Sequence, residues 1–392
     1  MIEFDPYSRI VDSNPFPLYK NLRDNDPCHW SDAGDCWVIT RYQDIIDCNQ
    51  NWQVFSSAGG NMLDDKPERA GNTLGTTDPP RHDRLRILIQ AAFMRRNIAH
   101  LEQTISDVAN DYLDKAQSAG QLDFISDFSS PVTISVLSNM LGIAAEDRVD
   151  VRRNVINFLQ TDPDAREKTA SQHASFDWLK QYAALQIEDR QAKIADGNPG
   201  SDLITALIEA EIDGLKLAET EILMTSLTLV MAGLESGSSF LAMMGLNLAE
   251  HPRARAELVS NPELISQAVE ESLRFNTSAQ RFRRTIAKDF ELHGKKLKAG
   301  DKALMCYGAG NRDERRYPDP DVYDIHRNPK QHLGLGVGKH VCIGAQVARM
   351  LSKQAMTVFL RRFPNYSLVD GELNWIASTT FRSPVELNIK LN

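Results

Sequence analysis

The run of residues 333–344 constrains this chain more than any other segment. It reads Leu-Gly-Leu-Gly-Val-Gly-Lys-His-Val-Cys-Ile-Gly and stands just before a long amphipathic stretch. Three alternating glycines allow a flat ligand to approach the backbone closely. A thiolate placed ahead of a helix is stabilised by the helix dipole and by amide N–H groups, which should lower the pKa of Cys342 and suit it to binding a metal.

Two phosphate-binding motifs are the competing interpretations of these glycines, and neither fits. In a P-loop, Gly-Lys is followed by Ser or Thr, but His340 follows Lys339, and Leu333 stands where the first glycine is required. The dinucleotide fingerprint fails because the glycines recur at every second residue. A buried structural cysteine remains the alternative, and the glycine context favours a haem cradle over it.

Bulk composition narrows the class of protein. The 392 residues could form one large domain or two to three average ones, and we expect a single domain over residues 1–392, because no low-complexity linker or repeat interrupts the chain. A net charge of −9 argues against broad nucleic-acid binding. The first residues show no signal-peptide pattern, and no run of eighteen uncharged apolar residues occurs. The five widely spaced cysteines fit neither a disulfide scaffold nor a structural zinc site. We therefore expect a soluble cytoplasmic protein that binds neither nucleic acid nor membranes.

Short β signals flank a mostly helical middle. Residues 37–40 and 302–306 have strand composition, and residues 289–297 predict a hairpin that turns at His293 and Gly294. The tail alternates apolar residues from 385 to 391, as a half-buried strand does. Helical spacing follows the prolines at 79 and 80, and another helix is expected from Pro262.

Residues 222–248 are apolar almost all round and predict a long central helix. Its interior breaks the pattern with the run Ala-Gly-Leu-Glu-Ser-Gly at 232–237. Each glycine costs about 1 kcal/mol relative to alanine in a helix, and a buried carboxylate costs several kcal/mol unless it is paired. Such a violation is expected at a functional site, although Glu235 and Ser236 could also face solvent on an ordinary amphipathic helix.

Taken together, these segments resemble the cytochrome P450 family, the haem-thiolate monooxygenases, and in particular its soluble bacterial members. Residues 336–344 follow the haem-loop signature, residues 232–236 resemble the acid-alcohol motif of the oxygen-binding helix, and Glu271 and Arg274 fit the Glu-x-x-Arg motif. The order and spacing of the motifs cover nearly the whole chain. The resemblance implies a mainly α fold with small β-sheets, a long central helix and a cysteine haem loop.

The resemblance also assigns the residues around a haem b cofactor. Cys342 is expected to be the axial ligand of the iron, with Gly336 and Gly344 in its loop. His82, Arg86, Arg284 and His340 are expected to hold the haem propionates, and arginine suits a carboxylate because it can bond bidentately.

Activity and its alternatives follow from the same resemblance. It implies activation of O₂ at the haem, proton delivery through Ser236 and Glu235, and insertion of one oxygen atom into a substrate C–H bond. The usual threonine is Ser236, and the phenylalanine usually found seven residues before the cysteine is Leu335, which keeps an apolar cover but loses the ring. The alternatives are a peroxide-driven peroxygenase, which tends to lack the acid-alcohol pair, a haem-based sensor without turnover, and a decayed relative that binds no haem.

Electrons are expected from a ferredoxin or flavodoxin, because the chain carries no flavin or iron–sulfur module. No acidic residue occurs between Ile325 and Val369, which predicts a basic face around the cysteine that would attract an acidic partner. Its expected contacts are Lys330, Lys339, Arg349, Lys353, Arg95 and Arg96.

The resemblance locates a substrate pocket only in outline. Its expected lining residues are Thr228, Met231, Ala232, Gln280, Phe282, Thr380 and Phe381. These suggest a mainly apolar pocket with a few hydrogen-bonding groups, which suits hydroxylation or O-demethylation of a small terpenoid or a substituted aromatic. Residues 62–66 are expected in an entrance loop whose pocket-facing side chains the sequence does not identify.

Overall fold

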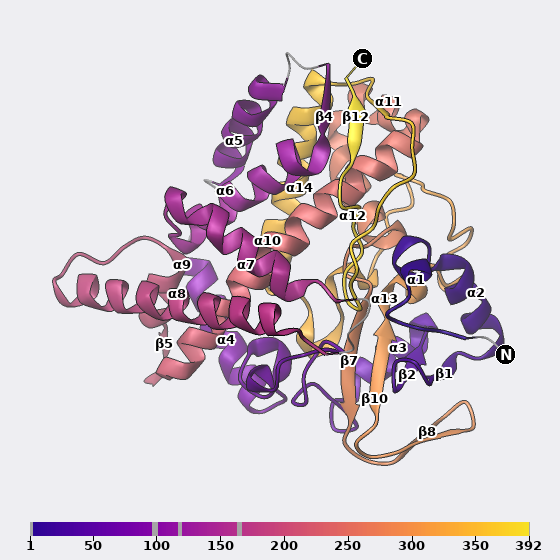
Figure 1. The fold of residues 1–392 in the computed structure, drawn as a ribbon, viewed down its shortest axis with the longest axis horizontal. Coiled ribbons are helices and arrows are strands. Elements are labelled where there is room, and N and C mark those ends of the chain that lie inside the picture. The colour runs from indigo at the N-terminus through magenta and orange to yellow at the C-terminus, as the bar shows by residue number, and fades with distance from the viewer. Residues whose placement is uncertain (1–2, 96–100, 117–119, 163–166, 392) are drawn as a thin grey trace.

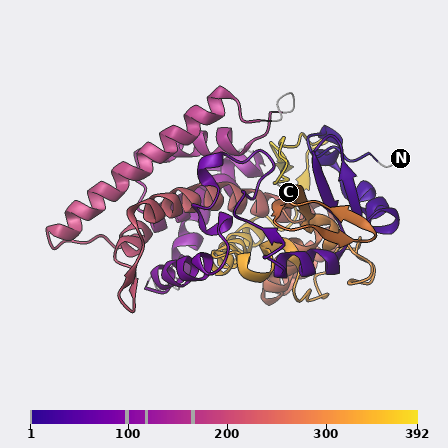
Figure 2. The same ribbon diagram turned by 90° about the horizontal axis from the view of Figure 1, so that it is seen from below.

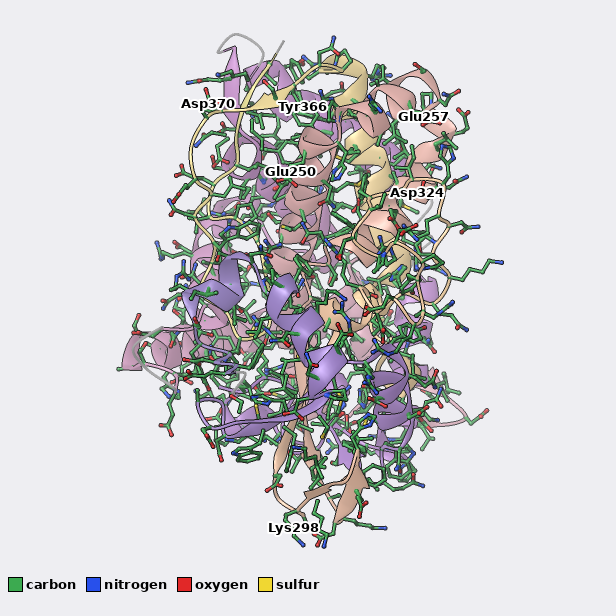
Figure 3. All side chains as sticks on the ribbon, turned by 90° about the vertical axis from the view of Figure 1, so that its right-hand side faces the viewer. Glu250, Glu257, Lys298, Asp324, Tyr366 and Asp370 are labelled. Atoms are coloured by element: carbon green, nitrogen blue, oxygen red, sulfur yellow. The ribbon has the colours of Figure 1, made fainter. Side chains whose placement is uncertain are left out.

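Helices form most of the molecule, and a β-rich part lies at one side (Figure 1). The computed structural model describes residues 3–95, 101–116, 120–162 and 167–391. Seen from below, α8 (Ala170–Ala195) lies on the side away from the N-terminal strands (Figure 2). Lys298, just after the β8–β9 hairpin, lies at one end of the molecule, and Tyr366 and Asp370 lie near the other (Figure 3).

The remaining α-helices are α1 (Arg9–Ser13), α2 (Phe16–Asn25), α3 (Tyr42–Gln50), α4 (Arg81–Arg95), α5 (Leu101–Ala116), α6 (Ser130–Leu141), α7 (Arg148–Leu159), α9 (Leu203–Ile208), α10 (Glu219–Glu250), α11 (Pro252–Ser260), α12 (Ile265–Phe275), α13 (Tyr307–Gly310) and α14 (Ala345–Arg362). The strands are β1 (Cys28–Ser31), β2 (Cys36–Ile39), β3 (Phe55–Ser56), β4 (Gln121–Asp123), β5 (Glu211–Ile212), β6 (Leu215–Lys216), β7 (Arg281–Ile286), β8 (Phe290–Leu292), β9 (Lys295–Leu297), β10 (Lys302–Cys306), β11 (Ser367–Leu368) and β12 (Asn388–Lys390). Short 3-10 turns include η7 (Pro262–Leu264), η8 (Leu333–Leu335) and η9 (Gly338–His340), and η5 (Phe124–Ser129) is a π-helical turn.

The largest sheet has the strand order β1-β2-β10-β7-β3. Strand β10 pairs in parallel with β2 and antiparallel with β7. The predicted hairpin is confirmed as β8 and β9, with His293 at φ 52° and Gly294 at φ 73° in its turn. The expected tail strand is shorter than predicted, because only Asn388–Lys390 pair as a strand, between β11 and β4. Val385, the first residue of the predicted strand, is 54% exposed.

Helix α10 runs through the middle of the molecule and belongs to two hydrophobic cores (Figure 1). Its first half, up to Leu234, packs in the core that includes α7, α8 and α9. Its second half, from Phe240, packs in the core that includes α5, α12 and α14. The polar break predicted at 232–237 therefore lies at the junction of the two cores. One shared helix supports the expectation of a single domain, which stays a prediction.

The two glycines of this break allow α10 and α6 to lie close together. A Cβ atom at Gly237 would lie 2.9 Å from the Cγ2 of Thr133, and one at Gly233 would lie 3.1 Å from a methyl group of Leu137. A larger residue at Gly237 would require Thr133 to shift, and one at Gly233 would crowd the end of the Leu137 side chain. The helical cost of these glycines is thus offset by close packing.

By length and apolar composition, α10 could cross a membrane, and it is the one helix in the described ranges of which this is true. The sequence search for an uninterrupted apolar run misses it because Glu235 divides the helix. Within the fold, 67% of its most apolar stretch is buried by the rest of the protein. Core helices of globular proteins pass the same test, so this property is weak support for a membrane span.

A buried ion pair fixes the segment that leads to the cysteine loop. Glu271 and Arg274 on α12 are fully buried, with 2.7 Å between Nη2 and Oε1. Arg274 also donates to the carbonyl groups of residues 311, 320 and 322. Glu271 also accepts from the backbone N–H of Asp324 and from Arg327. Residues 311–327 are therefore held against α12.

We predict that Arg274→Gln lowers the free energy of unfolding by about 3–5 kcal/mol, because it leaves a buried carboxylate without its main partner. The matched control is Arg153→Gln, which breaks an exposed pair at the same i, i+3 spacing with Asp150. That change should cost less than about 1 kcal/mol. Urea denaturation followed by circular dichroism measures both, and equal losses would contradict the structural role of the buried pair.

Candidate functional site

A cavity of about 350 Å³ lies between α10 and the cysteine loop. Its wall is mostly apolar and comes from segments far apart in the sequence. These segments include the loop 61–75, α4, α6, α10, β7, residues 334–352 and Phe381 near the C-terminus. Predicted site residues that line it are Arg86, Thr228, Met231, Ala232, Ser236, Phe282, Arg284, Gly336, His340, Cys342, Gly344 and Phe381.

The cysteine loop consists of two 3-10 turns, η8 and η9, followed by α14. Gly336 and Gly338 have φ values of 74° and 70°, a left-handed conformation that favours glycine. At Gly334 the requirement is close approach, because a Cβ atom there would lie 2.2 Å from the carbonyl oxygen of Leu273. The backbone N–H of Cys342 donates to the carbonyl oxygen of Leu335 at 2.8 Å. The loop thus presents Cys342 at the cavity wall just before α14.

The thiol of Cys342 is accessible from the cavity, yet protein encloses the cavity on most sides. Among the protein atoms alone, burial raises the pKa of Cys342, and it outweighs the lowering by the backbone N–H of Gly344 and by Arg86. The expectation of a lowered pKa is therefore wrong for the protein atoms alone. A thiol that coordinates a metal loses its proton because of the charge of the metal.

Four nitrogen-bearing side chains gather beside the cysteine loop. The rings of His82 and His340 are 4.5 Å apart between their centroids. Arg86 donates to the carbonyl groups of Lys339 and Val341. Arg284, on β7, is buried and donates to the side chain of Asn49 at 2.8 Å. His82 itself packs against His340 and is not part of the cavity wall.

These four residues have unused capacity to bind an anion. The Nε2 of His82 and both ring nitrogens of His340 are buried without a hydrogen-bond partner of good geometry in the described chain. Burial and the nearby Arg284 and Arg86 lower the pKa of His340 to about 2. Neither arginine forms an ion pair with a described carboxylate, and both bond only to neutral oxygens. A group with two carboxylates beside a flat body, as in haem b, fits these positions.

On α10, Ser236 and Glu235 occupy different environments. Ser236 lines the cavity, and its hydroxyl donates to the carbonyl oxygen of Ala232 one turn earlier. Glu235 is partly buried away from the cavity and accepts a hydrogen bond from Ser239 at 3.2 Å. Burial raises the pKa of Glu235. The partial burial of Glu235 argues against the solvent-facing alternative for this residue, and the two side chains do not face each other, as expected for adjacent helical residues.

The predicted substrate pocket needs two corrections. Gln280 and Thr380 are buried and do not line the cavity. The amide of Gln280 lies over Gly308, where a Cβ atom would be 1.9 Å from its Oε1, and it donates to the carbonyl oxygen of Thr277. The backbone of Thr380 accepts from the N–H of Gln280. Both residues therefore form hydrogen bonds between neighbouring backbone segments and do not contact the cavity.

The sequence did not identify several cavity residues on the loop 61–75. Asn61, Met62, Arg69 and Leu74 all line the cavity. Their spacing is irregular because 3-10 turns at Pro67–Arg69 and Leu74–Thr76 interrupt the loop. No helical or strand period marks the inward positions, so only the fold reveals them.

The basic face predicted around the cysteine is weaker than the sequence suggested. Lys339 pairs with Asp83 at 2.9 Å, and Arg349 pairs through two hydrogen bonds with Glu270. These acids come from α4 and α12, outside the acid-free run. Lys330 and Lys353 are exposed and form no ion pair with a described residue. The side chain of Arg95 and the whole of Arg96 lie outside the described residues.

We predict that Gly334→Ala lowers the free energy of unfolding by about 1–3 kcal/mol, because its Cβ atom would meet the backbone of Leu273. The matched control in the same loop is Gly344→Ala. No protein atom lies within 4 Å of a Cβ atom there, and the φ of −88° suits alanine. This control should change the stability of the ligand-free protein by less than about 0.5 kcal/mol in urea denaturation. Equal losses in the two variants would contradict the close approach at Gly334.

Comparison with known proteins places this geometry in a family. The family model described as cytochrome P450 matches residues 35–367. The putative cytochrome P450 123 of Mycobacterium tuberculosis is 31% identical over 99% of this chain and 96% of its own length. Nocardicin C N-oxygenase of Nocardia uniformis is 33% identical over 98% of this chain and 97% of its own length.

Solved structures agree with this assignment. Cytochrome P450 CYP109Q5 from Chondromyces apiculatus has a TM-score of 0.89 at 31% identity, covering 100% of this chain and 98% of its own. The bacillaene polyketide synthase cytochrome P450 PksS of Bacillus subtilis has a TM-score of 0.90 at 29% identity, covering 99% of this chain and 100% of its own. With a cysteine loop, a central helix and a cavity that fit that fold, the chain belongs to the cytochrome P450 family of haem b monooxygenases.

Proposed function

We propose that this monooxygenase hydroxylates or O-demethylates a small, largely apolar organic molecule, using O₂ and electrons from a ferredoxin-type partner. The observation that carries the proposal is the position of Cys342, on a glycine loop in the wall of a mostly apolar cavity. We further propose that the protein acts as a soluble cytoplasmic enzyme, which the burial of α10 within the fold supports.

In this proposal each residue around the cofactor has one role. Cys342 would ligate the iron, and Gly336 and Gly344 would leave room for the flat ring. Arg86, Arg284, His82 and His340 would hold the two propionates, since Arg86, Arg284 and His340 line the cavity, His82 packs against His340, and all four have unused donors or positive charge. When bound, haem b supplies the redox-active iron at which dioxygen is reduced.

Ser236 and Glu235 would have separate roles in proton delivery, the first as a hydroxyl in the cavity and the second as a carboxyl group behind it. Ser236 lines the cavity, where its hydroxyl can exchange its bond to Ala232 for one to a ligand or water. Burial raises the pKa of Glu235, so its carboxyl group holds a proton more readily than an exposed one and could pass that proton on. Because Glu235 does not line the cavity, transfer from it to Ser236 would require an intervening water or a side-chain rotation.

The apolar wall would orient the substrate and exclude water. Phe282 and Phe381 contact each other edge to face, with ring centroids 6.3 Å apart, and Met231 and Ala232 add to the same cavity wall. Thr228 donates its hydroxyl to the carbonyl oxygen of Met224, so its oxygen can accept a hydrogen bond from a ligand. This wall suits an apolar body with few polar groups.

The test of this function is oxygen uptake coupled to product in the presence of a reductase and a ferredoxin. We expect Ser236→Ala to keep the spectrum of the thiolate-ligated haem and to lower the ratio of product to oxygen consumed by about 10-fold or more, with peroxide as the balance, because the cavity loses its hydroxyl. The matched control is Ser226→Ala, which removes a buried hydroxyl of α10 that does not line the cavity.

Each alternative predicts a different result in the same assay. A peroxygenase would form product from added peroxide without reductant. A sensor would bind ligands without turnover, and a decayed relative would give no thiolate spectrum. Unchanged coupling in Ser236→Ala would contradict the proposed role of its hydroxyl.

Lys330 and Lys353 form no ion pair with a described residue, so they are better candidate contacts for the electron-transfer partner than the paired Lys339 and Arg349. We predict that Lys330→Glu and Lys353→Glu each slow reduction by an acidic ferredoxin about 3- to 10-fold at low ionic strength, with the effect fading as salt screens it. Lys180→Glu on α8 is the control for a general change of charge. Stopped-flow reduction at several salt concentrations measures the rates, and unchanged rates in both variants would exclude this face as the docking site.

A further inference from the structure

The loop 61–75 contributes two polar side chains to an otherwise apolar stretch of the cavity wall. Arg69 lines the cavity and is 5% exposed. Its Nη1 donates to Asp65, but its Nε has no partner and its Nη2 makes no hydrogen bond within the described chain. Asn61 also lines the cavity. Its Oδ1 is buried without a partner, and its Nδ2 makes no hydrogen bond within the described chain. Buried polar atoms left without partners cost free energy, so a cavity wall that keeps them is arranged for a polar ligand group.

The charge around this loop has a positive surplus. Three of the loop's charged residues pair with residues outside the loop, as Asp64 with Lys168 at 2.7 Å, Lys66 with Asp177 at 2.8 Å and Glu68 with Lys180 at 3.3 Å. Within each of these pairs the two charges cancel. Asp65 is the remaining carboxylate of the loop, and it pairs with Arg69.

Arg283 is the cation that remains without an acid. It lies on β7 and donates to the carbonyl groups of Gly59 and Met62, and the negative charge of Asp65 acts on it. It forms no ion pair with any described residue, and its Nε is unpartnered. Burial lowers the pKa of Arg283, as expected for a cation that is not fully compensated. Asp65 thus has two guanidinium neighbours and can neutralise only one.

The surplus is separate from the charges beside the cysteine loop. Arg86 bonds to the backbone of the cysteine loop and Arg284 to Asn49, whereas Arg69 bonds to Asp65 and Arg283 to the carbonyl groups of Gly59 and Met62. Arg86 and Arg284 carry the two charges that two propionates require. Arg69 and Asn61 therefore have donors available for a different anion.

We propose that the substrate carries a carboxylate on its apolar body, and that Arg69 and Asn61 bind this carboxylate with Arg283 as the supporting charge. The inference rests on the proposed function, because the ligand of this wall is taken to be the substrate. It narrows the substrate class from small apolar molecules to apolar acids. A neutral hydrogen-bond acceptor would satisfy the free N–H groups but would leave the surplus charge of the loop uncompensated.

The experiment compares matched acids and alcohols by isothermal titration calorimetry of the haem-loaded protein. The probes are cinnamate with cinnamyl alcohol, and dodecanoate with dodecanol. We expect at least one acid to bind about 10- to 100-fold more tightly than its alcohol, as charge-assisted hydrogen bonds allow. Equal or tighter binding of both alcohols, or no binding of any probe up to its solubility limit, would overturn the inference.

Three variants assign the preference to this loop. Arg69→Gln should abolish the preference for the acid, and Asp65→Asn should increase it, because asparagine keeps an acceptor for the N–H of Asn61 but removes the compensating charge. The matched control Lys180→Gln removes a positive charge on α8 that pairs with Glu68 of the same loop, and it should leave the preference unchanged. Retention of the preference in Arg69→Gln would overturn the assignment. The wild-type comparison and Asp65→Asn still decide the matter where Arg69→Gln fails to fold.

Two further readouts separate this inference from the proposed function. The reduced carbon monoxide spectrum of each preparation reports thiolate ligation, so loss of that spectrum in the wild type would defeat the proposed function itself. An intact spectrum without any preference for acids would defeat only the carboxylate inference. Faster haem loss from Arg69→Gln with an unchanged acid preference would place Arg69 in the cofactor cradle instead, and would also overturn the inference.

Discussion

The buried pair of Glu271 and Arg274 fixes the position of the segment from which the cysteine loop starts. Removing two charges from water is costly, and the pair alone would not repay it. The cost is offset because Arg274 also satisfies three backbone carbonyl groups and Glu271 also accepts from Asp324 and Arg327. Asn311, whose carbonyl group accepts from Arg274, in turn accepts the N–H of Leu333 at 2.6 Å through its side chain. The first residue of the cysteine loop is thus tied to α12 through one intermediate residue.

Features determined by neighbours in the chain could be predicted from the sequence. The glycines of the cysteine loop, the hairpin at His293 and Gly294 and the apolar run of α10 each depend on local conformation or on periodicity. Their bounds in the structure agree with the expectations, apart from the shortened tail strand and the 3-10 turn η7 that precedes α12. The family resemblance added the residues beside the cysteine, and Arg86, Arg284 and His340 do lie on the cavity wall.

Features determined by tertiary partners could not be predicted. Lys339 and Arg349 stand in an acid-free stretch of sequence, but Asp83 and Glu270 reach them from other helices. Gln280 has the polarity expected of a pocket residue, yet the close approach of Gly308 holds it behind the wall. The same limit applies to Arg69 and Asn61, since an irregular loop carries no period that distinguishes inward from outward residues.

Ion pairing separates charges that hold the fold together from charges that are available to ligands. Carboxylates of the protein pair with Arg274, Lys168 and Arg349. The pair of Arg274 lies within one helix, and the pairs of Lys168 and Arg349 join segments that are distant in the sequence. Arg86, Arg284 and Arg283 bond only to neutral oxygens in the described chain, so the fold keeps their charge without using it. Maintaining such cations in a low-dielectric interior is costly unless an anion compensates them. Arg86 and Arg284 line the cavity, and Arg283 bonds to the backbone of Gly59 and Met62 beside it, which supports the proposal that the natural contents of the cavity carry negative charge at more than one place.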